Sequence, residues 1–282
     1  MTVQVEWIFD LHRFCILEVI MERLKFLSEY YTTHDEDARL ASRHGSVEFL
    51  TTVHYIEKYL QTGMRILEIG AGTGRYSHYF ARRGYEVDAI ELMDCNIEVF
   101  RANTYPDEKV TVRQGDAINL EGIPSDYYDI TLLLGPMYHL YTDEDKCAAM
   151  SEAIRVTKKG GIVFAAYCNS DMTVYKFCFV KNGINSEQHR DLINFDTFEL
   201  NSTPKEVFSL YRKEDIDALM KNYNVKRLHY VGTDMLTRFI KQTVNQMDDE
   251  TFALYMKYHL CICERPDMVG ATNHMLDIFR KE

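Results

Sequence analysis

A short apolar stretch that runs into a glycine-rich turn constrains this chain more than any other feature. Residues 66–74 read ILEIGAGTG, with Gly70, Gly72 and Gly74 at alternate positions. Glycine lets the backbone adopt left-handed conformations and approach a ligand more closely than any side chain would allow. A helix is expected to begin near Arg75, so its first amides would point at the same ligand. The segment therefore predicts a strand, a ligand-binding turn and a helix in succession.

The spacing of the glycines separates several kinds of nucleotide site. Dinucleotide-binding turns follow the pattern G-x-G-x-x-G, whereas Arg75 stands where the third glycine would fall. A P-loop requires Gly-Lys-Ser or Gly-Lys-Thr, and neither follows this turn. The glycines alone leave two interpretations, a site for S-adenosylmethionine (SAM) and a variant dinucleotide site.

The apolar segments that follow favour the SAM interpretation. Residues 85–91 form a short predicted strand that ends in Glu91, 21 residues after Gly70. An acid at this distance can bind a ribose hydroxyl pair. Residues 110–114 form the next predicted strand. Two further predicted strands lie at 129–134 and 161–166.

A second motif follows the third predicted strand. The carboxylate of Asp116 can accept a hydrogen bond from an adenine amino group, and the backbone amide of Ala117 can reach a ring nitrogen. This series resembles the class I SAM-dependent methyltransferases. The resemblance covers residues 47–170 most closely. It is carried by LEIGAGTG at 67–74, Glu91, the triplet 115–117 and RVTKKGG at 155–161.

The resemblance implies a fold, a cofactor and a set of contacts. The implied fold is α/β, with a Rossmann-like doubly wound sheet of seven strands in the order 3-2-1-4-5-7-6. Residues 273–280 would form the last, antiparallel strand. The implied cofactor is SAM, with S-adenosylhomocysteine as its product. The implied cofactor contacts within the core are Glu68, Gly70, Ala71, Gly72, Gly74, Glu91, Leu92, Asp116, Ala117 and Leu134.

The chain before the core is expected to close over the cofactor. Apolar residues at helical spacing predict an amphipathic helix at about 9–29, and a second helix is predicted at about 47–60. By the resemblance, Tyr30, Tyr31 and Arg39 belong to a lid over the methionine end of SAM. The guanidinium of Arg39 suits the cofactor carboxylate, although it can equally pair with the acids just before it on the surface.

The rest of the chain alternates core and inserted segments. The inserted helices would roof the crevice at the carboxyl ends of the strands, which favours a small enclosed acceptor, and they can also form a homodimer interface. The predicted divisions are a lid at 1–46, the SAM-binding core at 47–170, a cap at 171–212, a core helix and strand at 213–234, a helical cap at 235–266 and the final strand at 267–282.

Methyl transfer from a sulfonium is a direct displacement that depends mainly on positioning and exclusion of water. A base is needed where the acceptor must lose a proton. His139 lies in the loop after the fourth predicted strand and is the candidate base, although it can instead cap a helix or pack under the lid. Tyr138 can contact the acceptor or pack. The loop lacks the Asn or Asp before Pro-Pro-Tyr found in enzymes that methylate amides or nucleobases, so that acceptor class is weakened.

Composition limits the partners. The net charge of −11 repels nucleic-acid phosphates, so no nucleic-acid substrate is expected. Seven cysteines without a CxxC motif indicate reduced thiols in a cytoplasmic protein. The histidines lack ligand spacing, so no metal is predicted. No stretch is long and apolar enough to span a membrane, and the N-terminus does not read as a secretion signal.

The predicted function is methyl transfer from SAM to an oxygen or nitrogen of a small molecule. Three alternatives remain open at this point. A SAM-binding sensor or assembly protein without turnover would use nearly the same cofactor residues. A NAD-dependent oxidoreductase is disfavoured by the glycine spacing and by the Asp116 motif. An RNA methyltransferase would need a basic face despite the acidic composition.

Overall fold

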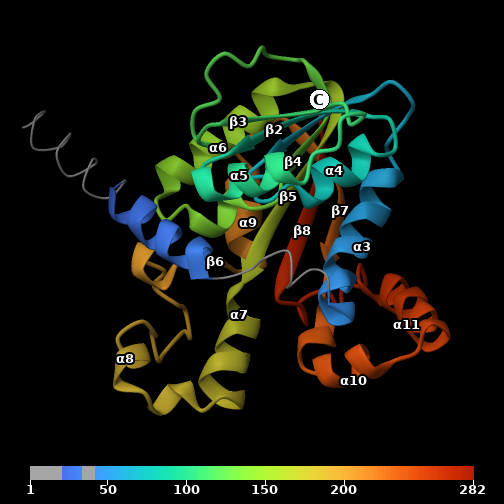
Figure 1. Cartoon of the computed structure of the whole chain (residues 1–282). Helices are drawn as coiled ribbons and strands as arrows, with labels where there is room; N and C mark the ends of the chain where they lie inside the picture. Colours follow the sequence, from blue (N-terminus) through green and yellow to red (C-terminus); the bar gives the residue numbers. More distant parts are fainter. Residues whose placement is uncertain (1–20, 34–41) are drawn as a thin grey trace, which may run out of the picture.

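The apolar segments of the sequence form the strands of one mixed sheet (Figure 1). The computed structural model describes residues 21–33 and 42–282, apart from the side chains of residues 188 and 189. The strands pair in the order β3-β2-β1-β4-β5-β8-β7, and β6 pairs with β5. Their bounds are β1 Arg65–Ile69, β2 Glu86–Glu91, β3 Val110–Gln114, β4 Tyr128–Leu133, β5 Thr157–Asn169, β6 Leu210–Tyr211, β7 Val225–Gly232 and β8 His274–Lys281.

This arrangement confirms the predicted topology. Strands β3, β2, β1, β4 and β5 are parallel, and β8 runs antiparallel between β5 and β7. The predicted order of seven strands is therefore found once the short β6 is set aside. The sequence did not predict β6, a two-residue strand parallel to the end of β5.

Helices cover both faces of the sheet because its central strands are apolar on both sides. In β5, Val163 faces a core cluster that includes residues of α6 and α9, whereas Phe164 faces a cluster that includes residues of α3 and α4. All four of these helices, together with α5, pack around the sheet. Their bounds are α3 Arg43–Glu57, α4 Arg75–Ala81, α5 Asp94–Ala102, α6 Asp143–Val156 and α9 Lys213–Met220.

Two further groups of helices lie outside the sheet, at the carboxyl ends of the parallel strands (Figure 1). The first follows β5: α7 Ser170–Thr173 continues directly as the π-helix η2 Val174–Val180. It is followed by η3 Gly183–Asn185, α8 Glu187–Arg190 and η4 Pro204–Glu206. The second group follows β7 and consists of η5 Met235–Arg238, α10 Lys241–Gln246 and α11 Asp249–Ile262.

The remaining elements connect the strands to the site. Residues 21–33 are helical and overlap the helix predicted at 9–29, and η1 Pro136–His139 follows β4. The helix α11 is capped by the side chain of Asp248, which accepts a hydrogen bond from the Thr251 amide at 2.8 Å. In the described part of the chain, no helix combines the length and the hydrophobicity needed to cross a bilayer.

Candidate functional site

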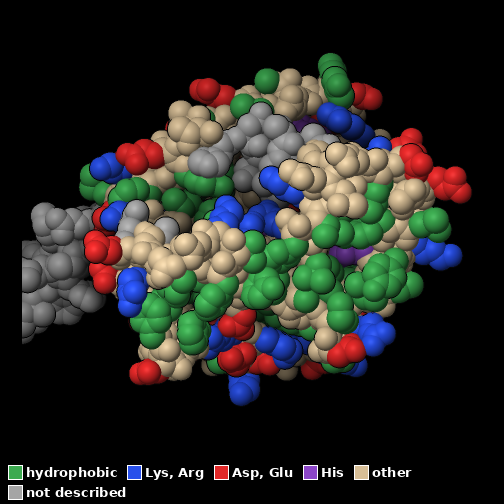
Figure 2. All heavy atoms as spheres, turned by 90° about the horizontal axis from the view of Figure 1, so that it is seen from below, with side chains coloured by type: hydrophobic (Ala, Val, Ile, Leu, Met, Phe, Trp, Pro, Cys, Tyr) green, Lys and Arg blue, Asp and Glu red, His purple; other side chains and the backbone are tan. Residues whose placement is uncertain are grey.

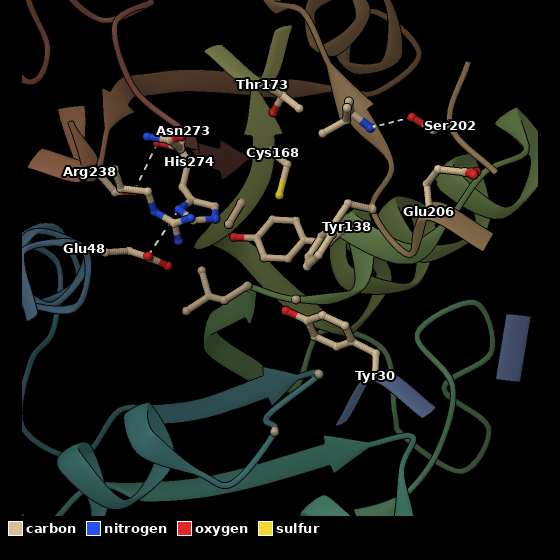
Figure 3. Close-up of a pocket in the computed structure, with 18 of the residues that line it drawn as sticks. Tyr30, Glu48, Tyr138, Cys168, Thr173, Ser202, Glu206, Arg238, Asn273 and His274 are labelled. Carbon is tan, nitrogen blue, oxygen red and sulfur yellow. Dashed lines mark hydrogen bonds and ion pairs between the residues drawn. The ribbon is translucent and has the colours of Figure 1, made fainter. Parts of the chain in front are cut away.

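A cavity of about 650 Å³ lies at the carboxyl edge of the parallel strands, on the side of the molecule that Figure 2 shows. One part of its wall is the glycine turn after β1, together with Leu134, Gly135 and Tyr138 after β4. The opposite part comes from the segments after β5 and β7 and from the beginning of β8. The cavity therefore extends from the predicted cofactor site to a region lined by Glu48, Tyr138, Arg238, Asn273 and His274, which we call the second chamber (Figure 3).

The three glycines of the turn have positive φ angles of 75°, 55° and 90°, but they differ in what surrounds them. A Cβ atom at Gly70 would lie 2.6 Å from Cδ of Pro136, and one at Gly74 would overlap the ring of Phe100. A Cβ atom at Gly72 would meet no protein atom within 4 Å. Gly70 and Gly74 are thus required by packing inside the protein, whereas Gly72 faces open space in the cavity.

Glu91 holds this turn in place. Its Oε2 accepts a hydrogen bond from the Gly72 amide at 2.7 Å, and its Oε1 accepts from the Met93 amide at 2.9 Å and from Asn96 Nδ2 at 3.1 Å. Neither Glu91 nor Leu92 is among the residues that line the cavity, whereas Asn96 is. The contact of Glu91 with a ribose stays a prediction, because its carboxylate already binds protein donors on both oxygens.

Glu68, at the end of β1, lies on the cavity wall and is 2% exposed. Burial raises the pKa of its carboxyl group to about 8. The hydroxyl of Ser77 donates to its Oε2 at 2.5 Å. At neutral pH the group is therefore largely protonated, and it can donate one hydrogen bond as well as accept others.

The Asp116 motif has a partner that the sequence did not reveal. Its carboxylate forms an ion pair with Arg23 of the helix at residues 21–33, and the Arg23 side chain is 5% exposed. Neither Asp116 nor the buried Ala117 lines the cavity. The contact of the Asp116 carboxylate with adenine stays a prediction. A cofactor bound to this carboxylate would have to displace the Arg23 guanidinium or share the carboxylate with it.

The predicted lid and the predicted base meet in one hydrogen bond. The Tyr31 hydroxyl lies 2.9 Å from Nε2 of His139, and Nδ1 of His139 lies 2.8 Å from the Val207 carbonyl oxygen. Because the carbonyl can only accept, Nδ1 carries the proton and Nε2 accepts from the tyrosine. Burial lowers the pKa of His139 to about 4, so the ring is neutral at physiological pH.

Tyr31 lines the cavity and His139 does not. The ring of Tyr30, which also lines the cavity, packs edge-on against Tyr31 and against Phe208, with ring centroids 5.3 Å and 5.4 Å apart. The geometry of His139 therefore fits the placement of Tyr31 better than direct contact with an acceptor. Arg39, the other predicted lid residue, lies outside the described residues.

The second chamber contains a polar cluster that sequence reasoning missed. Nδ1 of His274 lies 3.2 Å from Oε2 of Glu48 and 3.3 Å from Oδ2 of Asp234. Burial opposes a charge on His274, but the two carboxylates outweigh it and raise its pKa well above the usual value. In Figure 3 the His274 ring lies beside Glu48 and Arg238, and Tyr138 extends into the same chamber. The rings of Tyr138 and His274 have centroids 5.8 Å apart.

These three side chains come from α3, from the turn after β7 and from the start of β8. Their ligand atoms lie within 4.8 Å of one another, a spacing that a metal ion could bridge. The positive charge of His274 already balances one carboxylate, and Nε of Arg238 lies 3.2 Å from Oδ2 of Asp234. The cluster is thus best described as an ion-pair network, and the absence of a metal stays a prediction.

Comparisons with known proteins support the interpretation of the glycine turn as part of a methyltransferase domain. A family model described as a methyltransferase domain matches residues 66–161. The ubiquinone biosynthesis O-methyltransferase of Stutzerimonas stutzeri is 23% identical over 69% of this chain and 84% of its own length. An S-adenosyl-L-methionine-dependent Diels-Alderase of Talaromyces variabilis is 30% identical, but the match spans only 36% of this chain and about a third (35%) of that relative's length.

Solved structures share the fold. A protein from Pyrococcus horikoshii superimposes with a TM-score of 0.60 at 14% identity, over 90% of this chain and 99% of that one. Residues 66–161 are therefore a methyltransferase domain, and the strand order is the one expected from the resemblance to the class I SAM-dependent methyltransferases. The cofactor of this chain is accordingly SAM.

Proposed function

We propose that this protein transfers the methyl group of SAM to an oxygen or nitrogen atom of a small-molecule acceptor, with S-adenosylhomocysteine as the second product. The observation that carries the proposal is the continuous cavity from Gly72 to the polar cluster at His274. Its volume of about 650 Å³ lies within the usual range for small-molecule sites, roughly 300 to 1,000 Å³. Such a cavity can hold a cofactor and a small acceptor together.

The side chains that line the cavity support direct displacement. The helix at residues 21–33 contributes Tyr30 and Tyr31 to the wall, and the segment after β5 contributes apolar side chains such as Phe177 and Ile193. These groups exclude water and hold two reactants in a fixed orientation, which are the main requirements for attack on an activated methyl group. We therefore propose that the lid and cap segments close over the site.

His274 is better placed than His139 to take a proton from the acceptor. It lines the cavity, and its Nδ1 lies 3.2 Å and 3.3 Å from the carboxylates of Glu48 and Asp234. Because these carboxylates raise its pKa well above the usual value, the ring loses its own proton at a higher pH than an ordinary histidine does. We infer that methyl transfer to a hydroxyl acceptor becomes faster as the pH rises into the alkaline range. A His274→Gln variant should lose this rise in kcat.

The direct test is formation of S-adenosylhomocysteine from methyl-labelled SAM across a panel of phenols, carboxylic acids and amines. The expected result is a product with one added methyl group, found by mass spectrometry, in the presence of one acceptor class. Gly72→Ala should suppress the signal, and Gly63→Ala should keep it, since Gly63 lies in an exposed turn that does not line the cavity. SAM binding without product from any acceptor would contradict the proposal and favour a SAM-binding role without turnover.

We also propose a homodimer, a cytoplasmic location and a substrate that is not a nucleic acid. A homodimer through the segment 235–266 is supported by Leu254 and Tyr258 of α11, whose exposed fractions are 62% and 60%. Light scattering should then give twice the monomer mass, and Leu254→Glu should halve it. A cytoplasmic location and the lack of a nucleic-acid substrate rest on composition alone. Salt-sensitive binding of RNA would contradict the second of these.

A further inference from the structure

Two basic side chains from distant segments meet at one wall of the second chamber. Lys176 lies in η2 and Arg238 ends η5, and both line the cavity. The two segments pack together, since the rings of Tyr175 and Phe239 lie 5.6 Å apart. Figure 2 shows Lys and Arg side chains beside the hollow near the centre of this face. The fold therefore brings positive charge to the end of the cavity away from the glycine turn.

This charge is only partly balanced by acids. The Nε atom of Arg238 pairs with Asp234, whose carboxylate also lies beside His274. Lys176 makes no ion pair or hydrogen bond with any residue in the part of the chain that the structure describes. Burial, together with Arg238 and two neighbouring lysines, lowers the pKa of Lys176 to about 8. An ammonium group with a lowered pKa lacks a sufficient counter-charge, and a bound anion would supply it.

A third donor faces the same chamber. The side chain of Asn273 lines the cavity, and the residue is 8% exposed. Its Nδ2 atom is buried and has no hydrogen-bond partner among the described residues. Its backbone is fixed, because the Asn273 amide donates to Oδ1 of Asp234 at 2.8 Å. A buried donor without an acceptor is costly, so a ligand oxygen at this place would remove that cost.

We propose that Lys176, Arg238 and Asn273 bind an anionic group of the acceptor, a carboxylate or a phosphate, so that the methylated molecule is an acid. The inference rests on the proposed function, since it concerns the acceptor of that same cavity. The wall next to the donors is apolar and includes Phe177, Ile193 and Leu200. The acceptor is therefore an acid with an apolar body that fits this wall. We assign the anion to the acceptor and not to the carboxylate of SAM, because the cofactor is expected at the glycine turn.

The test uses the full chain saturated with S-adenosylhomocysteine. Calorimetry measures binding of a panel of aromatic and aliphatic carboxylic acids, such as 4-hydroxybenzoate, each compared with its methyl ester and with the matching phosphate monoester. We expect at least one anion to bind tenfold or more tightly than its ester, as charge-assisted contacts from two partly buried cations imply. The arm that binds best distinguishes a carboxylate acceptor from a phosphate acceptor.

Two variants locate the site. Lys176→Met and Arg238→Met should each reduce anion affinity about tenfold or more and leave the affinity for S-adenosylhomocysteine unchanged, which also shows that they fold. Lys181→Met is the matched control, because it removes the same charge from the exposed residue that follows the same helix and does not line the cavity. If every ester binds as well as its acid, or if the preference for acids survives both substitutions, the inference is wrong.

The two proposals fail in different ways. Binding of an acid without formation of S-adenosylhomocysteine from SAM would contradict methyl transfer and leave the anion site in place. Methylation of esters as fast as acids would contradict the anion site and leave methyl transfer in place.

Discussion

Substitution of Gly72 by alanine separates contact with the cofactor from strain in the backbone. Gly72 has a φ angle of 55°, and an added Cβ atom would meet no protein atom within 4 Å. Gly63 provides the control, since its φ angle is 85° and its Cβ would also meet nothing within 4 Å. Each substitution places an alanine in the left-handed region, which costs roughly 1–2 kcal/mol. The free energy of unfolding should therefore fall by a similar amount in both variants.

Binding should change in only one of them. Gly72 lines the cavity, and its amide is held by Glu91. A methyl group there occupies the space through which the cofactor approaches the backbone, and overpacking of this kind costs about 1–3 kcal/mol. That energy corresponds to a loss in SAM affinity of about 5-fold to 150-fold at 25 °C. Gly63 lies outside the cavity, so Gly63→Ala should bind SAM as the wild type does.

The assay is calorimetric titration of both variants with S-adenosylhomocysteine, with urea denaturation in parallel. Weaker binding by Gly72→Ala at equal stability of the two variants is the expected result. If Gly72→Ala binds with wild-type affinity, the cofactor does not approach this turn. If Gly63→Ala loses as much affinity as Gly72→Ala, strain and not contact is responsible. Either result would refute the placement of the cofactor.

Three other results are expected. Gly74→Ala should lower the free energy of unfolding by about 1–3 kcal/mol in urea, because its Cβ would overlap Phe100; unchanged stability would contradict the packing. The raised pKa of His274 stabilises the fold fully below its unfolded pKa, about 6.5, and this stability is lost as pH rises through the folded pKa; His274→Gln should flatten that decline in urea midpoints. His139→Ala and Tyr31→Phe should raise the SAM KM alike if His139 positions Tyr31, whereas a much larger fall in kcat for His139→Ala would indicate a base.

Most of the sheet could be predicted because each strand and turn is marked by residues that are adjacent in the sequence. Strands buried on both faces read as continuous apolar runs, and the turn after β1 shows its glycines directly in the sequence. Strand β6 escaped prediction because two residues carry no periodicity, and only its pairing with β5 defines it. The irregular segment between residues 181 and 209 likewise has helical turns that are too short to show a periodic apolar pattern.

In the candidate site too, the parts built from adjacent residues could be predicted and the parts built from distant residues could not. The part of the cavity at the glycine turn is built from strand ends and the turns that follow them. A few adjacent residues such as Glu68 and Gly70 therefore show in the sequence that they belong to it. The Asp116 motif was visible, but its partner Arg23 lies 93 positions away and in a helix with no motif. The polar cluster required the packing of α3 against the region of η5 and β8, a long-range contact that one sequence does not show.

The residues of the second chamber can change without altering the glycine turn. Glu48, Lys176, Arg238 and His274 contribute to the second chamber from four segments, none of which is the glycine turn. Substitutions among them alter charge in that chamber while the hydrogen bonds of Glu91 to the turn stay in place. Acceptor specificity and SAM affinity should therefore vary independently in this protein. Effects of pairs of substitutions, one from each half, are expected to add in binding free energy, as they do for distant sites without shared partners.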